Sequence, residues 1–585
     1  MYTQLSPVGI HRKGEKMTGF PSKDRPWLKY YCEAAPKATI PSGSIYDYLC
    51  EMNRDVPDSI AIEYLGWTIT YSEFFEMINQ AAAAFQHYGV KEGDIVSLAI
   101  PNIPENVIAI YALNKIGAIS NMVDLRLSGE ELERYFNEVE SKVIVVCDLF
   151  LHNTLSVLDQ LQAETVIVCS PFDHLPLPIR WALKKKAHVK IPKGIDGLIT
   201  WKDFVKGPYE PAVDRHTLGS ATASILHTSG TTGNSKGVML SNRSFNALAV
   251  EYQYIYGEGH FKADERIMNQ VPPFLAYNVI LSMHTPLTLH LRLVLLPNYE
   301  PEKYAENILK YKPQHVTAGP ADWENFLDNP VLEGKDLSFL RTIASGSDTI
   351  RYDIKKKIDA LLAEHGSPCS IIEGYGMTEV GCAATTNHYD IDVPGSVGVP
   401  YPFVNICIYD NENQKELSYH EKGEICISGP RLMNGYYNNP AATEEVMQRH
   451  DDGIVWMHSG DLGYLDENGF LFLDGRLKRI IIQHNGMKIN PFEVERAILS
   501  HPDVKFCCVV GHPDKEHGRG FLPAAYFVME PDCKLSPDEL IAEVKKTCEE
   551  KLAERYQPQW FYVLPELPLT PNGKVDYRKL ESEAQ

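Results

Sequence analysis

The sequence has 585 residues, and its 56 Lys and Arg against 77 Asp and Glu give a net charge of −21. A surface this acidic disfavours a general nucleic-acid-binding protein, because contacts with phosphates need a basic face. Hydrophobic residues make up 44% and charged residues 23% of the chain, a composition that disfavours global disorder. The length predicts several domains or subdomains.

The cysteines and the apolar stretches indicate a soluble cytoplasmic protein. The 12 cysteines are scattered without a C-x-x-C motif, a pattern that favours reduced thiols over a zinc ribbon or a redox pair. The first 20 residues carry charges but no apolar run, so they do not form a secretory signal. The uncharged stretch between Arg266 and Arg292 contains three prolines and several polar side chains, which predicts buried core rather than a membrane span.

Most of the chain alternates strand-like apolar runs with helical patterns. Residues 1–40 are rich in Pro, Lys and Gly and predict an N-terminal arm. A short hairpin is expected around Gly66. Expected helices and buried strands then follow in turn, at 81–90 (helix), 95–102 (strand), 105–118 (helix), 129–139 (helix) and 142–148 (strand). This alternation, which continues into the 370s, is typical of parallel α/β layers.

The pattern of predicted elements changes near residue 395. Short strands separated by turn residues predict a β-rich subdomain over about 395–477. After Arg479, strands and helices are mixed, as in a small α+β unit. The predicted fold class is α/β, with a large N-terminal domain of parallel α/β subdomains plus the β-rich subdomain, and a small C-terminal domain. We place the arm at 1–40, the large domain at 41–477 and the C-terminal domain at 478–585.

The most informative segment is HTSGTTGNSKG, residues 227–237. Small hydroxyl residues and glycines let N–H and O–H groups converge on an anion, and Lys236 adds a positive charge. It is not a Walker A loop, because Gly237 follows the lysine where that motif needs Ser or Thr, and this argues against a phosphotransferase. Taken alone, the segment is equally compatible with a polar turn between two strands.

Other polar segments follow apolar strands further along the chain. EGYGMTE, residues 373–379, offers an aromatic ring for a base, a hydroxyl for a phosphate and a carboxylate for Mg²⁺. In the segments HSGDLGY and DGRLKRI, Asp461 and Arg476 are suited to ribose hydroxyls, although an Asp–Arg pair that fixes a turn is a common alternative. Near the C-terminus, PLTPNGKVDYRKL places Lys574 on a loop rich in Pro and Gly.

Together these segments, in this order over residues 45–580, resemble the adenylate-forming superfamily of acyl-CoA synthetases, nonribosomal-peptide adenylation domains and firefly luciferase. The likeness is strongest to fatty acyl-CoA synthetases. The resemblance implies that ATP and a carboxylate form an acyl-adenylate and pyrophosphate, after which a thiol, usually that of CoA, displaces AMP. The implied cofactors are ATP, Mg²⁺ and CoA.

The resemblance also implies roles for individual residues. Tyr375 would stack on adenine, Thr378 would bind the α-phosphate, Glu379 would bind Mg²⁺, and Asp461 with Arg476 would hold the ribose. The β- and γ-phosphates would be held by Thr228, Ser229, Gly230, Thr231, Thr232, Gly233 and Lys236. The family often has Pro where this chain has Ser235, so we expect a looser phosphate loop.

The family's second half-reaction depends on a rotation of its C-terminal domain. Lys574 matches the lysine that bridges the substrate carboxylate and the α-phosphate, an electrostatic and positioning role. Lys478 matches the hinge, although its neighbour Arg479 stands where many relatives have an acid. The segment around Gly486 matches the one that lines the tunnel for the thiol.

The acid substrate is predicted from the pocket residues. Leu275 follows Phe274 where amino-acid-activating relatives have an Asp for the ammonium, so an amino acid would lack its counter-ion. None of the residues expected at the acyl pocket is charged, which favours a fatty or other apolar acid; they are Tyr277, Ala318, Gly319, Ser345, Gly346, Ser347 and Gly374. An aryl acid is the alternative.

Three further readings stay open at this stage. One is an acyl-AMP ligase that loads a carrier protein; no carrier domain follows Lys574, so we expect such a carrier to act in trans. Another is a non-catalytic nucleotide- or acyl-binding relative, which the presence of every motif lysine and acid disfavours. Finally, residues 179–193 contain six Lys or Arg, no acid and an interleaved Trp181, a pattern compatible with peripheral contact to anionic lipid or with an exposed basic helix.

Overall fold

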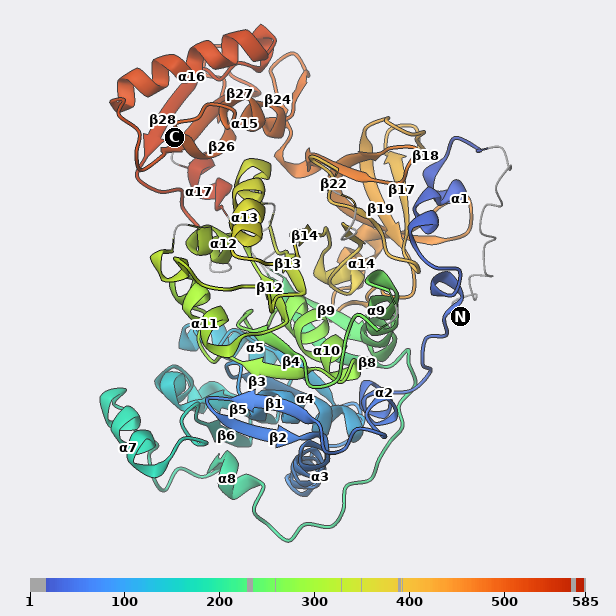
Figure 1. The fold of residues 1–585 in the computed structure, drawn as a ribbon, viewed down its shortest axis with the longest axis vertical. Helices are drawn as coiled ribbons and strands as arrows, with labels where there is room; N and C mark the ends of the chain where they lie inside the picture. The colour runs from blue at the N-terminus through green and yellow to red at the C-terminus, as the bar shows by residue number, and fades with distance from the viewer. Residues whose placement is uncertain are drawn as a thin grey trace.

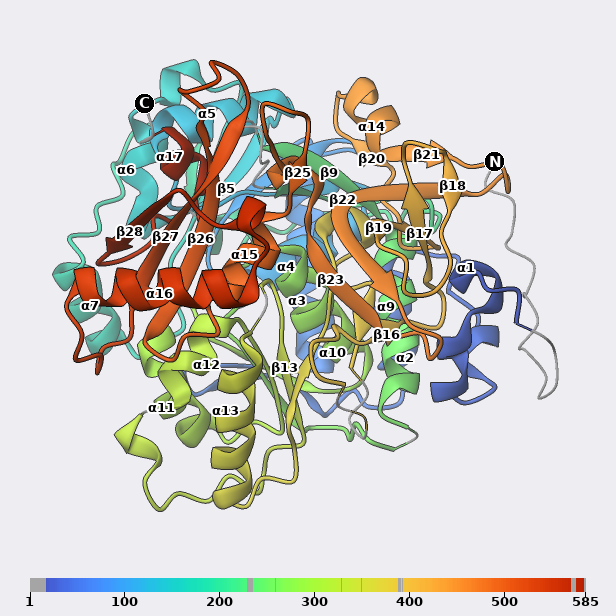
Figure 2. The same cartoon turned by 90° about the horizontal axis from the view of Figure 1, so that it is seen from above.

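The computed structural model describes residues 17–228, 235–257, 259–327, 329–348, 350–387, 391, 393–569 and 575–582. Within them, two large sheets and their helices form the lower two thirds of the molecule in Figure 1. A β-rich unit and a small C-terminal unit lie above these sheets, and Figure 2 shows them over opposite sides of the molecule. The predicted α/β fold class, with a large N-terminal and a small C-terminal domain, is confirmed.

One of the two large sheets has eight strands in the order β20-β9-β8-β4-β3-β5-β6-β7. Its central strands run parallel, whereas β8 and β9 form an antiparallel hairpin. The strands are β3 (Ile95–Ala99), β4 (Ile119–Met122), β5 (Val143–Cys147), β6 (Thr165–Cys169), β7 (Leu198–Thr200), β8 (Thr222–Thr228), β9 (Lys236–Ser241) and β20 (Gly435–Tyr436).

The other large sheet has seven strands in the order β14-β13-β12-β10-β11-β1-β2. The predicted hairpin is its β1–β2 pair, joined through Leu65 and Gly66 with φ of 49° and 88°, the left-handed conformation of a tight hairpin turn. The strands are β1 (Ile60–Tyr64), β2 (Trp67–Thr70), β10 (Arg266–Asn269), β11 (Arg292–Leu295), β12 (His315–Ala318), β13 (Thr342–Ser345) and β14 (Ile371–Glu373).

Helices of these two layers begin where the sequence supplies caps. Thr70 and Glu73 form a capping box at the start of α3 (Tyr71–His87), and Ser128 with Glu131 does the same for α5 (Gly129–Glu138). The helix α4 (Pro104–Lys115) is buried on nearly all sides and packs against α3 and β4. Further helices are α2 (Ile45–Met52), α7 (Leu177–Lys186), α9 (Asn242–Ile255), α11 (Tyr304–Tyr311), α12 (Pro320–Leu327) and α13 (Tyr352–Glu364).

The uncharged stretch predicted to be core is buried. It contains β10, a π-helix over Tyr277–His284 and α10 (Thr285–Thr288), whose side chains are almost all buried. Among the described residues, no helix combines the length and apolar character needed to cross a bilayer.

The β-rich unit and part of the predicted arm pack together. Of residues 1–40, the structure describes 17–40, in which α1 (Pro21–Asp24) packs on β17 and the side chain of Trp27 is fully buried. Ser22 donates hydrogen bonds to Glu416 through its backbone N and its Oγ, at 3.1 and 2.8 Å. The strands of this unit are β17 (Asn405–Asp410), β18 (Lys415–Glu416), β19 (Gly423–Ser428), β21 (Met447–Arg449), β22 (Val455–Leu465) and β23 (Leu471–Arg476).

The C-terminal unit follows a short 3₁₀ turn over Leu477–Arg479. It has its own apolar core between a three-stranded sheet and two helices. Arg351, before α13 of the large domain, donates to the carbonyl of Lys505 at 2.8 Å and so links the two units. Its elements are α15 (Pro491–Ile498), β26 (Val504–Pro513), β27 (Phe521–Met529), α16 (Pro537–Lys551), β28 (Trp560–Leu564) and α17 (Tyr577–Ser582).

Candidate active site

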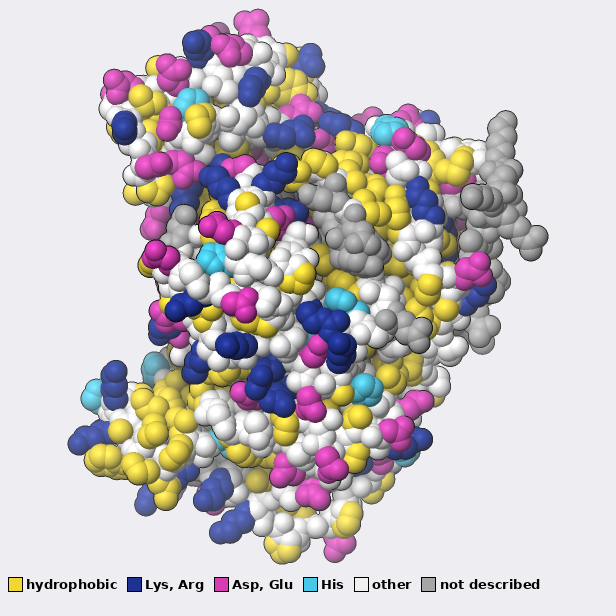
Figure 3. All heavy atoms as spheres, in the orientation of Figure 1, with side chains coloured by type: hydrophobic (Ala, Val, Ile, Leu, Met, Phe, Trp, Pro, Cys, Tyr) yellow, Lys and Arg dark blue, Asp and Glu magenta, His cyan; other side chains and the backbone are white. Residues whose placement is uncertain are grey.

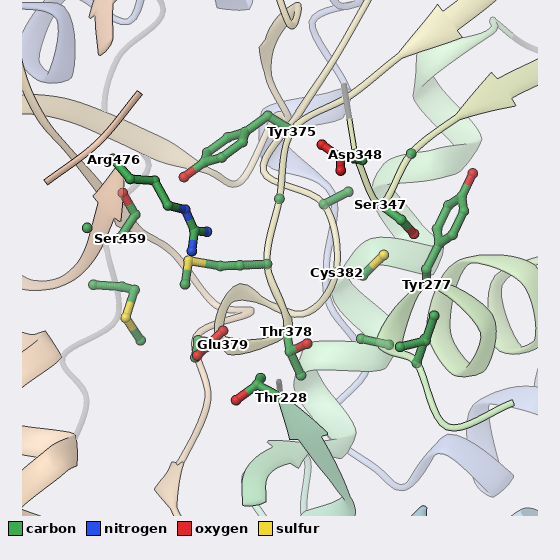
Figure 4. Close-up of a pocket in the computed structure, with 18 of the residues that line it drawn as sticks. Thr228, Tyr277, Ser347, Asp348, Tyr375, Thr378, Glu379, Cys382, Ser459 and Arg476 are labelled. Atoms are coloured by element: carbon green, nitrogen blue, oxygen red, sulfur yellow. The ribbon is translucent and has the colours of Figure 1, made fainter. Parts of the chain in front are cut away.

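A cavity of about 1300 Å³ lies where the two large sheets, the β-rich unit and the linker to the C-terminal unit meet. Figure 4 shows three groups of side chains around it. Thr228, Thr378 and Glu379 form one group, called the phosphate corner after its predicted ligand. Tyr375 and Arg476 form the ring-and-guanidinium corner, and Tyr277 and Cys382 belong to the apolar corner. The predicted residues that line the cavity are Thr228, Lys236, Tyr277, Ser345, Gly346, Ser347, Gly374, Tyr375, Thr378, Glu379, Arg476 and Lys478. Four predicted residues that the structure describes are not among its lining residues, namely Ala318, Gly319, Asp461 and Gly486.

The phosphate corner begins at the β8–β9 hairpin. Thr228 and Lys236 are opposite each other at the end of this hairpin, facing the cavity. Ser229, Gly230, Thr231, Thr232 and Gly233 lie outside the described residues. The Ser235 hydroxyl donates to the carbonyl oxygen of Thr228 at 2.5 Å. Ser235, which stands where relatives often have proline, therefore adds a hydrogen bond across the base of the loop. The expectation of a looser loop did not take this bond into account.

Glu379 is the buried acid beside this hairpin. It lies on a 3₁₀ turn over Thr378–Val380, and its Oε1 accepts a hydrogen bond from the Tyr436 hydroxyl at 2.8 Å. Lys236 Nζ lies 4.6 Å from the centroid of the same tyrosine ring. Burial raises the pKa of the Glu379 carboxyl, while the Tyr436 hydroxyl, Arg476 and Lys236 oppose that rise. Tyr436 thus positions both the acid and the lysine.

The ring-and-guanidinium corner joins three segments that are far apart in the sequence. Asp461 and Arg476 are cross-strand partners on β22 and β23, with 2.6 Å between Asp461 Oδ1 and Arg476 Nε. The Tyr375 hydroxyl donates to Asp461 Oδ2 at 2.8 Å. Asp461 is thus held by both neighbours, as expected for the alternative interpretation in which an Asp–Arg pair fixes a turn. Arg476 and the buried ring of Tyr375 face the cavity.

The apolar corner contains most of the residues predicted for the acid. The Tyr277 hydroxyl donates to the carbonyl of Ala318 at 3.3 Å. A Cβ at Gly346 would lie 3.2 Å from Cζ of Tyr277, so glycine allows the ring to approach the backbone closely. Cys382 also faces this corner, and burial raises the pKa of its thiol to about 12, so the thiol stays protonated at neutral pH.

The predicted hinge and the C-terminal loop meet the same cavity. Lys478 lines it and lies 3.9 Å from Glu445 in an exposed ion pair. Arg479, which stands where many relatives have an acid, forms an ion pair with Glu495 of the C-terminal unit. Lys574 lies outside the described residues. Val575, which follows it, lines the cavity. Gly486 is in the turn before Lys488, with φ of 81°.

Sequence reasoning missed several side chains of the cavity. His227, the first residue of the segment 227–237, was given no role but lines the cavity, and its Nε2 lies 2.6 Å from Oδ1 of Asn121. Burial, followed by the charge of Arg134, lowers the pKa of His227 to about 3, so the ring is neutral. Tyr436 was missed because it is 57 residues from Glu379. Three tyrosines that line the apolar corner were also missed, namely Tyr252, Tyr256 and Tyr401.

Comparison with known proteins identifies the family. The family model described as AMP-binding enzyme matches residues 51–437, and the one described as AMP-binding enzyme C-terminal domain matches residues 493–574. The chain belongs to the AMP-binding enzyme family. The predictions of an adenylate-forming enzyme and of its reaction class, an acid–thiol ligase, are thereby confirmed.

Members of this family with different substrates resemble the chain over nearly its full length. A long-chain-fatty-acid–CoA ligase of Bacillus subtilis is 30% identical, covering 96% of this chain and 98% of its own. A probable 4-coumarate–CoA ligase of Dictyostelium discoideum is 28% identical, with 94% and 97% covered. Among solved structures, ATP-bound MatB from Rhodopseudomonas palustris has a TM-score of 0.78 at 24% identity, covering 92% of this chain and 98% of that one; this likeness concerns the fold.

Proposed function

We propose that this AMP-binding enzyme activates an apolar carboxylic acid with ATP and transfers the acyl group to CoA. The observation that carries the proposal is the convergence on one cavity of residues from three separate segments, namely Lys236, the pair Tyr375 and Glu379, and Arg476. This combination of a cation, an acid for a metal, an aromatic ring and a guanidinium is suited to the phosphates, base and ribose of a nucleotide. The pairing of Asp461 with Tyr375 and Arg476 holds the last two in place.

In the proposed reaction, a carboxylate oxygen of the acid attacks the α-phosphorus of ATP and pyrophosphate leaves. Thr228 and Lys236 hold the departing phosphates, and Thr378 holds the α-phosphate, so the charge that develops is met by preorganised donors. The CoA thiolate then attacks the acyl carbonyl, and AMP leaves as the thioester forms. In both steps the chain positions two anionic groups that would otherwise repel each other.

Mg²⁺ fits the donors at this corner. Glu379 is a buried carboxylate whose Oε1 accepts a hydrogen bond from Tyr436, and carboxylate oxygens are hard ligands of the kind that Mg²⁺ takes. When bound, the ion would neutralise phosphate charge. The chain's own contribution is to hold the Glu379 carboxylate in one orientation through Tyr436.

A fatty or similar apolar acid is the substrate that we favour. The apolar corner contains Phe274, Leu275, Tyr277 and Leu281, and the first relative reported above acts on long-chain fatty acids. The tyrosines Tyr252 and Tyr256 favour the second candidate, an aryl acid, since aromatic rings pack well on one another. The 4-coumarate ligase relative supports that alternative.

A pyrophosphate-release assay over a panel of acids tests the proposal. The purified chain is given MgATP with octanoate, palmitate, benzoate, 4-coumarate or alanine, with and without CoA. We expect pyrophosphate and acyl-CoA from a fatty acid and none from alanine. Release without thioester would indicate a carrier protein as acceptor, and no release with any acid would indicate a non-catalytic binding protein.

The role proposed for Lys574 separates the two half-reactions. We expect Lys574→Ala to abolish acyl-adenylate formation, because the substitution removes the cation proposed to bridge the carboxylate and the α-phosphate. Thioester formation from supplied acyl-AMP and CoA should remain near the wild-type rate. Equal loss of both half-reactions in single-turnover assays would contradict the domain rotation about Lys478 that this role requires.

The site of action that we propose is the cytoplasm, at the surface of a membrane. All 12 cysteines are free thiols, as expected in a reducing compartment. The basis for contact with a membrane is the helix α7, which carries exposed apolar and basic side chains.

A further inference from the structure

The helix α7 projects from the large domain with apolar side chains in solvent. It has no buried residue, and the exposed fractions of Leu177, Ile179 and Trp181 are 69%, 51% and 68%. Figure 3 shows a hydrophobic patch that protrudes where Figure 1 labels α7. A tryptophan exposed beside two large aliphatic side chains indicates an interaction surface.

The charge around this patch is opposite to that of the chain as a whole. From His174 to Ile195 the sequence contains six Lys or Arg and no acid, in a chain with a net charge of −21. Four of these lysines are exposed, namely Lys185, Lys186, Lys190 and Lys193. Lys185 Nζ lies 5.0 Å from the Trp181 ring centroid, so the basic and apolar groups form one surface.

The other two basic residues fix α7 to the domain. Lys184 Nζ lies 2.8 Å from Oδ1 of Asp173 and 3.6 Å from Oδ2 of the buried Asp148. Arg180 donates to the carbonyl of Asp173 at 3.3 Å. These bonds point inward, so they orient the helix and leave its apolar residues directed outward. Lys184 is therefore a positioning residue and a poor choice for testing the surface.

We propose that α7 and the segment up to Lys193 are a docking surface for an anionic lipid bilayer. Trp181, Leu177 and Ile179 would enter the boundary between headgroups and acyl chains, which is where tryptophan and short apolar faces bind. The four exposed lysines would lie against the headgroup phosphates. Docking brings the enzyme to the phase that holds long apolar acids; that purpose rests on the proposed function, whereas the binding itself does not.

An anionic bilayer matches both properties of the surface better than a protein does. A second copy of this acidic chain would satisfy the lysines, but it would have to offer an apolar patch beside its acids. A bilayer presents negative charge and apolar depth together over the whole area.

Vesicle co-sedimentation of the full chain tests this proposal. The probes are phosphatidylcholine vesicles with and without phosphatidylglycerol, at physiological salt and without any acid substrate. We expect binding to the anionic vesicles only. Because each basic residue and each buried apolar group contributes separately, Trp181→Ala and the pair Lys185→Glu with Lys186→Glu should each weaken binding by about 10-fold or more.

Matched controls keep the test decisive. Lys202→Glu with Lys206→Glu changes the same charge at exposed lysines outside the patch, and Leu218→Ser removes a side chain that is 70% exposed elsewhere. Both should bind vesicles like the wild type. Equal loss in these controls, or no binding by the wild type, would overturn the proposal. So would a wild-type dimer, measured by analytical ultracentrifugation, that Trp181→Ala dissociates.

Pyrophosphate release with a water-soluble acid is measured for every variant. The α7 variants are expected to keep the wild-type rate, because α7 contributes no residue to the cavity. Failure of vesicle binding with normal release refutes the docking surface alone. Normal vesicle binding with no release from any acid refutes the proposed function alone.

Discussion

Tyr436 connects two residues of the phosphate corner that the sequence places far apart. Its hydroxyl binds Glu379, and its ring lies under the ammonium of Lys236. A hydrogen bond to a buried charged group is worth about 1.5–3 kcal/mol. Loss of the hydroxyl alone would leave Glu379 with one donor fewer in a buried position, where burial already raises the pKa of its carboxyl.

We therefore expect Tyr436→Phe to raise the Mg²⁺ concentration for half-maximal pyrophosphate release by about 10-fold, since 1.4 kcal/mol corresponds to a factor of ten. The effect should grow as the pH falls, because a carboxyl with a raised pKa takes up its proton sooner. The measurement is a Mg²⁺ titration at saturating ATP. Tyr437→Phe, at the half-buried neighbouring position, is the matched control. An unchanged Mg²⁺ requirement would show that Tyr436 does not orient Glu379.

At the scale of elements, a buried ion pair joins the β-rich unit to the large domain. Glu251 on α9 and Arg431 after β19 are both buried, with 3.0 Å between Oε2 and Nε. Glu251 also accepts the backbone N–H of Phe403, and the guanidinium of Arg431 lies over the ring of Tyr401 at 4.8 Å. The pair thus holds α9, which lines the apolar corner, against the loops of the β-rich unit.

Arg431→Met should destabilise the protein by about 3–5 kcal/mol, because it removes the ion-paired partner of a buried acid. The double variant Glu251→Leu with Arg431→Met should recover much of this loss, because an apolar pair of similar volume replaces an ion pair at little cost. Thermal unfolding of the full chain, followed by near-UV circular dichroism, compares the three proteins. Equal midpoints for the single and double variants would mean that the pair does not couple these elements.

At the scale of the whole molecule, buried histidines connect folding to pH. Burial lowers the pKa of His284 to about 3, and its ring is bound between Tyr111 and Asn246 at 2.9 and 3.1 Å. Burial likewise lowers the pKa of His227 to about 3 and that of His260 to about 4. In the unfolded chain each ring has a pKa near 6.5.

The stability of the protein should therefore fall as the pH drops below 6.5. The unfolded chain takes up protons that the folded chain excludes, so the contribution is fully present above pH 6.5 and is lost towards the folded pKa values of about 3 to 4. Between pH 6.5 and 5 the expected loss is about 2 kcal/mol per histidine. Thermal midpoints over this range test it, and His260→Gln should reduce the slope. A constant midpoint from pH 7 to 5 would contradict the prediction.

The sequence alone determined the local features of the protein. Capping pairs such as Thr70 and Glu73, the turn at Gly66 and the phosphate segment before Lys236 are written in neighbouring residues, because helix starts, tight turns and anion-binding loops depend on short-range geometry. Glu379, the acid proposed to bind Mg²⁺, was singled out from its own segment for the same reason. The alternation of strands and helices was enough to predict the α/β layers.

Only the tertiary structure decided which distant segments meet. It placed Tyr436 on Glu379, closed Asp461 between Tyr375 and Arg476, and left Gly319 away from the cavity lining. It also turned Lys184 inward while Trp181 stayed exposed, although both belong to one basic run. These outcomes depend on the packing of whole layers against each other, which no short stretch of sequence encodes. The candidate site residues could therefore be predicted from the sequence, whereas the side chains that they contact could not.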